Sequence, residues 1–126
     1  MTERTMKRSK ILIVDDEPNI LLSLDFLMRK KGYEVLIARN GQEAMDLLEL
    51  HQPDMIILDI MMPDIDGYQI CQHIKSTPNH THCKVLFLSA KSKESDVKYG
   101  LELGADAYMT KPFSTRQLMI KVEELL

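Results

Sequence analysis

The sequence predicts an α/β fold in which one parallel sheet is covered by helices on both faces. Three observations lead to this prediction. Short apolar runs rich in β-branched residues alternate along the chain with longer amphipathic stretches, which is the pattern of repeated βα units. Three of these runs are apolar without alternation, as is typical of strands buried on both faces. The length of 126 residues, of which 44% are hydrophobic, suits a single domain.

Five candidate strands follow one another along the chain. They are ILIVD, EVLIA, MIILD, KVLFLS and AYMT, at residues 11–15, 34–38, 55–59, 84–89 and 107–110. Apolar residues at helical spacing predict five helices, at residues 19–31, from Asn40-Gly41 to before Pro53, at 67–76, at 95–103 and from Ser114 to the C-terminus. Right-handed crossovers then give a doubly wound, flavodoxin-like (βα)5 sheet with strand order 2-1-3-4-5.

We expect residues 1–9 to form a disordered N-terminal tail and residues 10–126 to form one domain. The opening MTERTMKRSK lacks the apolar segment of a signal peptide, and no later apolar run approaches the roughly eighteen residues of a membrane span. The 19 acidic and 16 basic residues are spread along the chain, which favours neither nucleic acid nor a membrane as a direct partner. These features predict a cytoplasmic protein.

Cysteine and histidine residues raise the question of a structural metal. Cys71 and Cys83 are too few for a disulfide framework, so we expect free thiols. His80, His82 and Cys83 cluster in NHTHC, with His73 upstream. The cluster lacks the paired ligand spacing of most zinc sites, which argues against a metal there.

Polar residues occupy the predicted carboxyl ends of the strands, where open parallel sheets bind ligands. They are Asp15, Asp16, Asp59, Ser89 and Lys111. Three carboxylates at one place repel one another unless a cation is present. Mg²⁺ prefers oxygen ligands and keeps several waters, which leaves positions open for phosphoryl oxygens. Zinc and copper are not expected, because no nearby His or Cys belongs to the set.

The same residues suit phosphoryl transfer. That reaction needs a nucleophile in line with the leaving group and neutralisation of charge on the phosphoryl oxygens. Asp59 is the candidate nucleophile. A cation and the Lys111 ammonium would offset negative charge, and the Ser89 hydroxyl can donate a hydrogen bond to the new phosphoryl group.

The motifs VDDEP, LDIMMPDIDG, LSA and TKPF, in this order and over almost the whole chain, resemble those of bacterial two-component response-regulator receiver domains of the CheY-like type. The resemblance implies that Asp59 is the phosphoacceptor and that Mg²⁺ or Mn²⁺ is bound by Asp15, Asp16, Asp59 and the backbone carbonyl of Met61. It also implies that Lys111 and Ser89 contact the phosphoryl group.

The resemblance assigns further roles around this site. Tyr108 matches an aromatic switch residue, and Met61 and Lys91 match positions whose side chains tune hydrolysis of the aspartyl phosphate. The Lys111–Pro112 bond matches one that is commonly cis in the family, a form accessible mainly to X-Pro bonds.

The resemblance also implies partners. The phosphoryl donor would be a phosphohistidine on a sensor histidine kinase or a phosphotransfer protein. The surface of the fourth helix, fifth strand and fifth helix would then control an effector domain or protein. The chain would be a signalling receiver that catalyses only its own phosphorylation and dephosphorylation, and not an enzyme with a separate substrate. A stand-alone adaptor, a relay intermediate and a fragment of a longer protein all agree with the sequence.

In one branch of the family that the chain resembles, phosphorylation is linked to homodimerisation through this output surface, so a homodimer is possible here. That branch usually has a second acid where this sequence has Ala107, which leaves the dimer mode open. Charged residues on or near the surface are interpreted as solvated; they are Lys98, Glu102, Asp106, Arg116, Lys121 and Glu123.

Several residues have a simpler interpretation. Asp15 and Asp16 can cap the first helix, and Asp64 and Asp66 are ordinary turn residues in the loop after Asp59. A phosphatase resembling haloacid dehalogenases is the enzyme alternative, but its DxD, at 64–66, follows a proline turn and lacks the downstream Thr. Flavin binding is disfavoured by the acidic DDEPN loop. A phosphorylation-independent interaction module remains the main rival.

Overall fold

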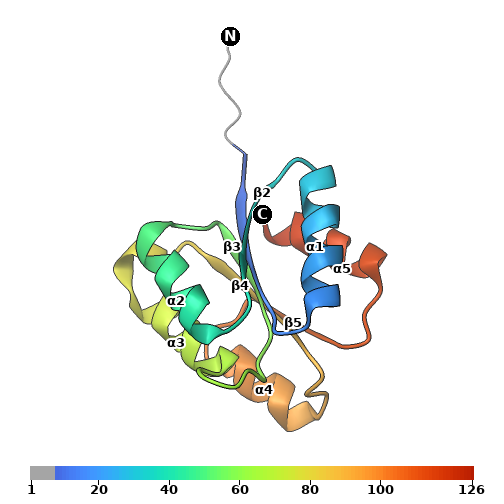
Figure 1. The fold of residues 1–126 in the computed structure, drawn as a ribbon. Helices are drawn as coiled ribbons and strands as arrows, with labels where there is room; N and C mark the ends of the chain where they lie inside the picture. Colours follow the sequence, from blue (N-terminus) through green and yellow to red (C-terminus); the bar gives the residue numbers. More distant parts are fainter. Residues whose placement is uncertain (1–7) are drawn as a thin grey trace.

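The computed structural model describes residues 8–126, in which a parallel sheet separates two layers of helices (Figure 1). The strands are β1 (Lys10–Val14), β2 (Glu34–Ala38), β3 (Met55–Leu58), β4 (Lys84–Ser89) and β5 (Ala107–Thr110). The helices are α1 (Pro18–Lys30), α2 (Gly41–Leu50), α3 (Gly67–Ser76), α4 (Glu94–Glu102) and α5 (Thr115–Leu125), with a short 3₁₀ helix, η1 (Pro78–His80). The strand order β2-β1-β3-β4-β5 confirms the predicted fold.

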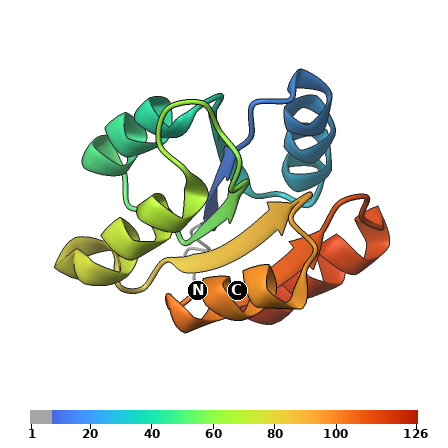
Figure 2. The ribbon, with the colours of Figure 1, turned by 90° about the horizontal axis from the view of Figure 1, so that it is seen from below.

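The sheet is buried on both faces. Helices α1 and α5 cover one face and α2, α3 and α4 cover the other (Figures 1 and 2). In β1, Ile13 packs in the cluster that contains residues of α1 and α5, whereas Leu12 packs in the cluster that contains residues of α2 and α3. All four residues of β3 are buried. The apolar runs without alternation therefore did predict two-sided strands.

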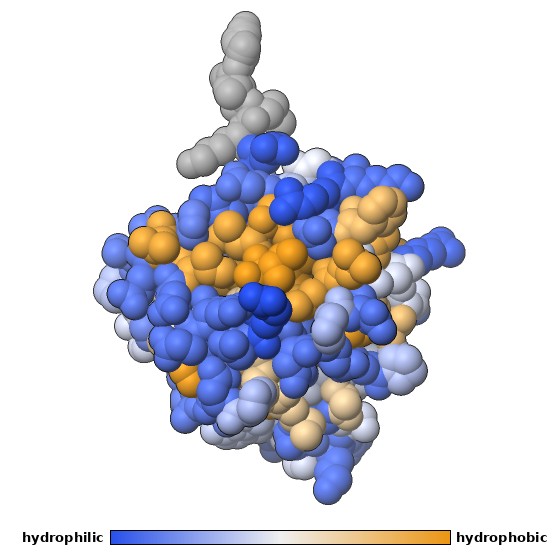
Figure 3. Space-filling view, viewed as in Figure 1, coloured by the Kyte–Doolittle hydropathy of each residue, from blue (hydrophilic) through white to orange (hydrophobic). Residues whose placement is uncertain are grey.

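The two edges of the sheet differ in their surroundings. Strand β2 forms one edge, between α1 and α2, and β5 forms the other. Figure 3 shows apolar side chains gathered over the β2 edge and the flanking helices. The exposed large apolar residues of these elements are Leu22, Phe26, Ile37 and Leu50. The surface of α4, β5 and α5, for which the resemblance implies an output role, lies at the opposite, β5 edge.

Local sequence signals explain where helices begin and end. Helix α1 ends at Lys30, and Gly32 follows the C-cap residue Lys31 with a φ of +93°, which suits glycine. The Gly32 N–H donates to the Arg29 carbonyl and the Tyr33 N–H to the Met28 carbonyl, which is a Schellman arrangement. Gly104, with a φ of +105°, ends α4 in the same way. These two glycines set the direction of the chain into β2 and β5.

The start of α1 differs from one alternative drawn from the sequence. Its N-cap is Glu17, and within residues 8–126 no side-chain cap hydrogen bond is made at that end. Asp15 and Asp16 precede the cap and do not serve as helix caps. The alternative that they have only a capping role is therefore wrong.

The expected tail of residues 1–9 falls largely outside the described residues. Of that stretch, the Ser9 carbonyl accepts a hydrogen bond from the Glu34 N–H at 2.9 Å, next to the start of β1 at Lys10. Within residues 8–126, no helix has the length and apolar character needed to cross a membrane.

The His and Cys cluster is part of the packing around η1. His80 and Cys83 are buried, and the His73 and His80 rings lie 6.3 Å apart between centroids. Within residues 8–126, these side chains do not form a group of three or more ligands close enough for a metal. Both cysteines are free, as expected. His80 and Cys83 thus pack in the interior, whereas His82 is exposed.

We predict that Cys71 and Cys83 are unreactive in the native protein. Burial raises the pKa of the Cys71 thiol to about 11 and that of Cys83 to about 12, so little reactive thiolate forms at mildly alkaline pH. A colorimetric thiol reagent should label neither residue until guanidinium unfolds the chain, after which both should react. Rapid labelling of either thiol before unfolding would contradict the prediction.

Candidate functional site

The register of the sheet brings the candidate site residues together. Val14 of β1 pairs with Leu58 of β3, so the residues that follow them, Asp15 and Asp59, emerge side by side at the carboxyl edge. The Asp59 N–H donates to the Val14 carbonyl at 3.0 Å and continues this parallel pairing by one residue. Figure 2 looks onto this edge of the sheet. The predicted convergence of the strand-end aspartates is therefore a direct result of parallel pairing.

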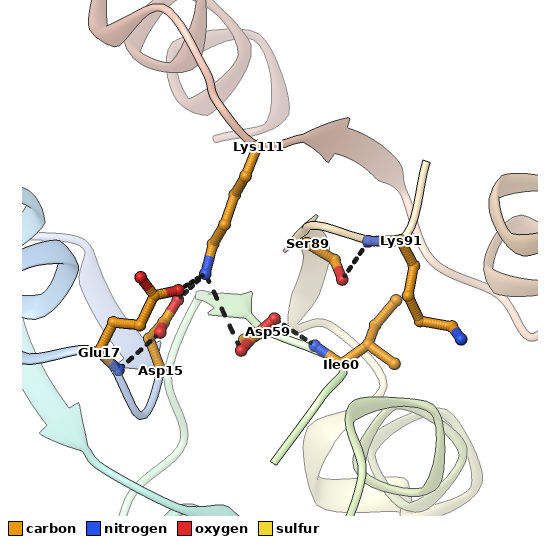
Figure 4. A network of polar contacts seen from close by, with 7 residues as sticks. All are labelled: Asp15, Glu17, Asp59, Ile60, Ser89, Lys91 and Lys111. Atoms are coloured by element: carbon orange, nitrogen blue, oxygen red, sulfur yellow. Dashed lines mark hydrogen bonds and ion pairs between the residues drawn. The ribbon is translucent and has the colours of Figure 1, made fainter. Parts of the chain in front are cut away.

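The same register positions the cationic part of the site. Ser89 at the end of β4 pairs with Thr110 of β5, and the Lys111 N–H donates to the Ser89 carbonyl at 2.8 Å. Lys111 thus emerges beside β4, and its side chain crosses toward the aspartates of β1 and β3 (Figure 4). The Lys111–Pro112 bond is cis, as the resemblance implied.

The ammonium group of Lys111 forms ion pairs with three carboxylates. Lys111 Nζ lies 2.8 Å from Asp15 Oδ2, 2.8 Å from Glu17 Oε2 and 3.9 Å from Asp59 Oδ2 (Figure 4). Sequence reasoning placed Lys111 and the aspartates here but missed Glu17. The signal was present as the third acid of VDDEP, two residues after Asp15. The Glu17 N–H also donates to Asp15 Oδ1 at 2.9 Å, so this residue helps to fix the buried carboxylate.

The site carries more negative than positive charge, and this imbalance appears in the ionisation of its groups. Burial, followed by the charge of Asp15, raises the pKa of Asp59 to about 6, although Lys111 opposes the shift. Burial also raises the pKa of Asp15. Burial alone would lower the pKa of Lys111, but its bonds to Asp15 and Glu17 raise it. The ammonium therefore stays charged and only partly offsets the acids.

These acids fit a hard divalent cation. Carboxylate oxygens of Asp15, Asp16 and Glu17 lie within 4.8 Å of one another, and Lys111 bridges Asp15 to Asp59. Asp16 is exposed and Asp15 is buried, so this group has one side open to solvent. All the side-chain donors are oxygens, which favours ions of the Mg²⁺ and Mn²⁺ type. Met61 lies in the loop after β3 with an exposed side chain.

The Asp59 carboxylate is oriented by its own backbone. Oδ1 accepts a hydrogen bond from the Ile60 N–H at 2.9 Å, and Oδ2 is the oxygen nearer to Lys111 (Figure 4). The loop after β3 packs closely behind this carboxylate. A Cβ atom at Gly67 would lie 2.4 Å from the Asp59 carbonyl oxygen, so only glycine fits where α3 begins.

Ser89 and Tyr108 are connected through the backbone of Lys91. The buried Ser89 Oγ accepts a hydrogen bond from the Lys91 N–H at 3.1 Å, and the Tyr108 hydroxyl donates to the Lys91 carbonyl at 2.7 Å. The Lys91 side chain points away from Asp59 in Figure 4, and its Nζ lies 3.7 Å from Asp96 Oδ1. Ser89 and Tyr108, which the sequence suggested separately, therefore both hydrogen-bond to the backbone of Lys91.

The other aspartates of the loop after Asp59 have structural roles beyond turn formation. Asp66 caps α3 in a capping box with Gln69. Asp64 accepts hydrogen bonds from the Gly41 and Gln42 N–H groups at 3.0 and 2.9 Å and thereby caps α2. Both acids of the DxD sequence are committed to helix starts, which removes the basis for the phosphatase alternative.

Asp106 has a role that the sequence did not suggest. Its carboxylate is not simply solvated, because Oδ2 lies 3.0 Å from Lys75 Nζ and accepts a hydrogen bond from the Val85 N–H at 2.8 Å. It connects the start of β5 to α3 and β4. Asp106 is thus exposed, as expected of a solvated charge, but its carboxylate also has a structural role.

Comparisons with known proteins agree with this geometry. The family model described as the response regulator receiver domain matches residues 11–123. The alkaline phosphatase synthesis transcriptional regulatory protein PhoP of Bacillus subtilis is 43% identical over 117 residues, which are 93% of this chain and 48% of PhoP. The chain thus spans about half the length of this curated relative.

Solved structures give the same result. A putative response regulator from Chloroflexus aurantiacus superposes with a TM-score of 0.88 at 34% identity, covering 94% of this chain and 98% of that one. The signal receiver domain of a signal transduction histidine kinase from Syntrophus aciditrophicus has a TM-score of 0.86 at 39% identity, covering 94% and 89%. With the family match over nearly the whole chain, these likenesses show that the chain belongs to the response regulator receiver domain family of two-component signalling systems.

Proposed function

We propose that this chain accepts a phosphoryl group on Asp59 from the phosphohistidine of a sensor histidine kinase or phosphotransfer protein. The observation that carries the proposal is the placement of the buried Asp59 carboxylate, 3.9 Å from the Lys111 ammonium and beside the Asp15 carboxylate. A candidate acceptor, an ammonium group and a cluster of acids that could hold a metal thus lie at one edge of the sheet.

The proposed metal is Mg²⁺ or Mn²⁺. Asp15, Asp16, Asp59 and the backbone carbonyl of Met61 would hold it. When bound, the ion would neutralise charge on the phosphoryl oxygens. The excess of acids over Lys111 supports this assignment, because a divalent ion would relieve the repulsion by Asp15 that, after burial, raises the pKa of Asp59.

The residues of the chain would perform the transfer as follows. At neutral pH most Asp59 side chains are ionised, since the pKa of about 6 lies below that pH. Asp59 Oδ2 would attack phosphorus, forming an O–P bond as the N–P bond to the donor histidine breaks. Lys111 would exchange a carboxylate contact for a phosphoryl oxygen, and the Ser89 hydroxyl would donate a hydrogen bond to another.

The proposed response begins at Ser89. Its Oγ now accepts from the Lys91 N–H, and Tyr108 donates to the carbonyl of the same residue. If the Ser89 hydroxyl turns toward a phosphoryl group, the Lys91 segment loses one of these two anchors. Tyr108 would then shift against Phe87, whose ring centroid is 5.7 Å away, and reshape the α4–β5–α5 surface.

This surface is the proposed site for an effector domain or protein. The similarity to PhoP, a transcriptional regulatory protein about twice as long, supports an attached or separate effector. A homodimer through the same surface is also proposed. Position 107 carries alanine and cannot supply an acidic contact, and Asp106 is already paired with Lys75. Acidic contacts in such a dimer would therefore have to come from other residues.

Phosphorylation of Asp59 can be tested with acetyl phosphate and Mg²⁺. We expect the intact protein to gain the mass of one phosphoryl group, and Asp59→Asn to gain none because it lacks the nucleophilic carboxylate. Chelation by EDTA should abolish the gain, and Asp46→Asn, an exposed control on α2, should behave as the parent chain. An equal mass gain in Asp59→Asn would contradict the assignment of Asp59 as the acceptor. No gain in the parent chain would favour a phosphorylation-independent module.

A second experiment concerns the lifetime of the aspartyl phosphate. Met61 is 59% exposed beside the site, and we expect its bulky apolar side chain to shield the phosphoryl group modestly from water. Met61→Asn should shorten the lifetime several-fold in a phosphate-release assay, whereas Met61→Leu, which keeps bulk and apolarity, should not. An unchanged lifetime in Met61→Asn would refute the shielding role.

The coupling between site and surface can be tested at Ser89. Ser89→Ala should still gain a phosphoryl group, because Asp59 and Lys111 remain. It should lose most of the change that phosphorylation causes in amide chemical shifts of α4, β5 and α5. The substitution also leaves the Lys91 N–H without its acceptor, at a cost of about 1–3 kcal/mol in folding free energy. Chemical shift changes equal to those of the parent chain would refute the mechanism.

A further inference from the structure

Helix α4 is anchored by few buried side chains. Of its nine residues in the described part of the chain, only Gly100 is buried, whereas α1, α2 and α3 bury three or four residues each. Within residues 8–126, its N-cap, Lys93, makes no side-chain cap hydrogen bond. The position of α4 must therefore depend on a small number of specific contacts.

Two tyrosine hydroxyls, one from α3 and one from β5, supply such contacts. Tyr108 of β5 donates to the Lys91 carbonyl at 2.7 Å, in the segment that leads from Ser89 into α4. Tyr68 of α3 donates to the Asp96 carbonyl, in the first turn of α4, at 3.3 Å. Burial raises the pKa of both phenols, so both remain donors at neutral pH. The start of α4 is thus held from two neighbouring elements.

Ring packing reinforces the Tyr68 contact. The Tyr68 ring meets Tyr99 of α4 edge to face, with centroids 4.7 Å apart, and meets Phe87 of β4 in the same way at 5.6 Å. A Cβ atom at Gly100 would come within 3.1 Å of both Phe87 and Tyr108. Helix α4 therefore lies directly on this group of rings, in which Tyr68 and Tyr108 both pack against Phe87.

Tyr68 is also attached to the acceptor loop. The preceding residue, Gly67, donates its N–H to the Ile60 carbonyl at 2.9 Å and lies against the backbone of Asp59. A displacement of the 59–60 backbone is thus passed to Tyr68 across one hydrogen bond and one peptide. This connection starts at Ile60 and Gly67, whereas the one described above starts at Ser89 and Lys91.

We propose that Tyr68 is a positioning residue that holds α4 in its unphosphorylated arrangement and forms a second connection from Asp59 to the output surface. The inference rests on the proposed function for its link to phosphorylation, but the contact to α4 stands apart from it. Phosphorylation would loosen the Tyr68 contact together with the Lys91 segment, so that α4 is released from both sides.

The test compares Tyr68→Phe with Tyr99→Phe in the full chain by amide hydrogen exchange of residues 94–102. Tyr68→Phe keeps the ring and removes the hydroxyl. Tyr99 belongs to the same ring cluster, but among residues 8–126 its hydroxyl makes no hydrogen bond, so it is a matched control. We expect exchange in unphosphorylated Tyr68→Phe to be about fivefold faster, the effect of losing one neutral hydrogen bond. Tyr99→Phe should match the parent chain.

The same comparison after acetyl phosphate treatment separates positioning from plain stabilisation. Phosphorylation of the parent chain should speed exchange in α4, and in Tyr68→Phe this further change should be much smaller because the helix is already loosened. No acceleration beyond Tyr99→Phe would overturn the proposal, as would an equal acceleration in both phosphorylation states. If mass spectrometry finds no phosphoryl group on Asp59, the proposed function fails, and exchange in the untreated variants still decides whether Tyr68 holds α4.

Discussion

The parallel pairing of β1 with β3 is the constraint on which the site depends, because it places two buried carboxylates side by side with one ammonium between them. This arrangement opposes folding. The pKa of Asp59 rises from 3.8 in the unfolded reference to about 6 in the folded chain, so its ionisation costs stability as the pH rises through that interval. Lys111 offsets part of the cost, and a bound cation would offset more. The fold thus maintains a site whose acids Lys111 only partly offsets, at a cost in stability.

Features that follow from repeating geometry were predictable from the sequence. Strands buried on both faces read as continuous apolar runs, and parallel strands put all their carboxyl ends at one edge, so the fold and the gathering of Asp15, Asp59 and Lys111 could be derived without a structure. The predicted ends of two strands differ from the observed ends by one residue, since β1 and β3 end at Val14 and Leu58.

Features that depend on how loops fold back were not predictable in this way. The capping of α2 by Asp64, the pairing of Asp106 with Lys75 and the reach of Glu17 to Lys111 all join segments at distances that no local pattern encodes. In each case the acid has no feature in its local sequence that marks it out for such a contact. A side chain that contacts a distant backbone N–H or ammonium leaves no periodic trace in sequence, whereas a buried strand does.

The close approach of Gly67 to the Asp59 carbonyl has a further consequence for how this domain tolerates change. Any side chain at position 67 would push the acceptor backbone and the start of α3 apart, and the collision is with rigid main chain that cannot move aside. In a saturation library selected for function, this glycine should be as strictly retained as Asp59, the proposed acceptor, but for reasons of volume and not of charge. Such selection would preserve a residue that contributes no side chain to the site.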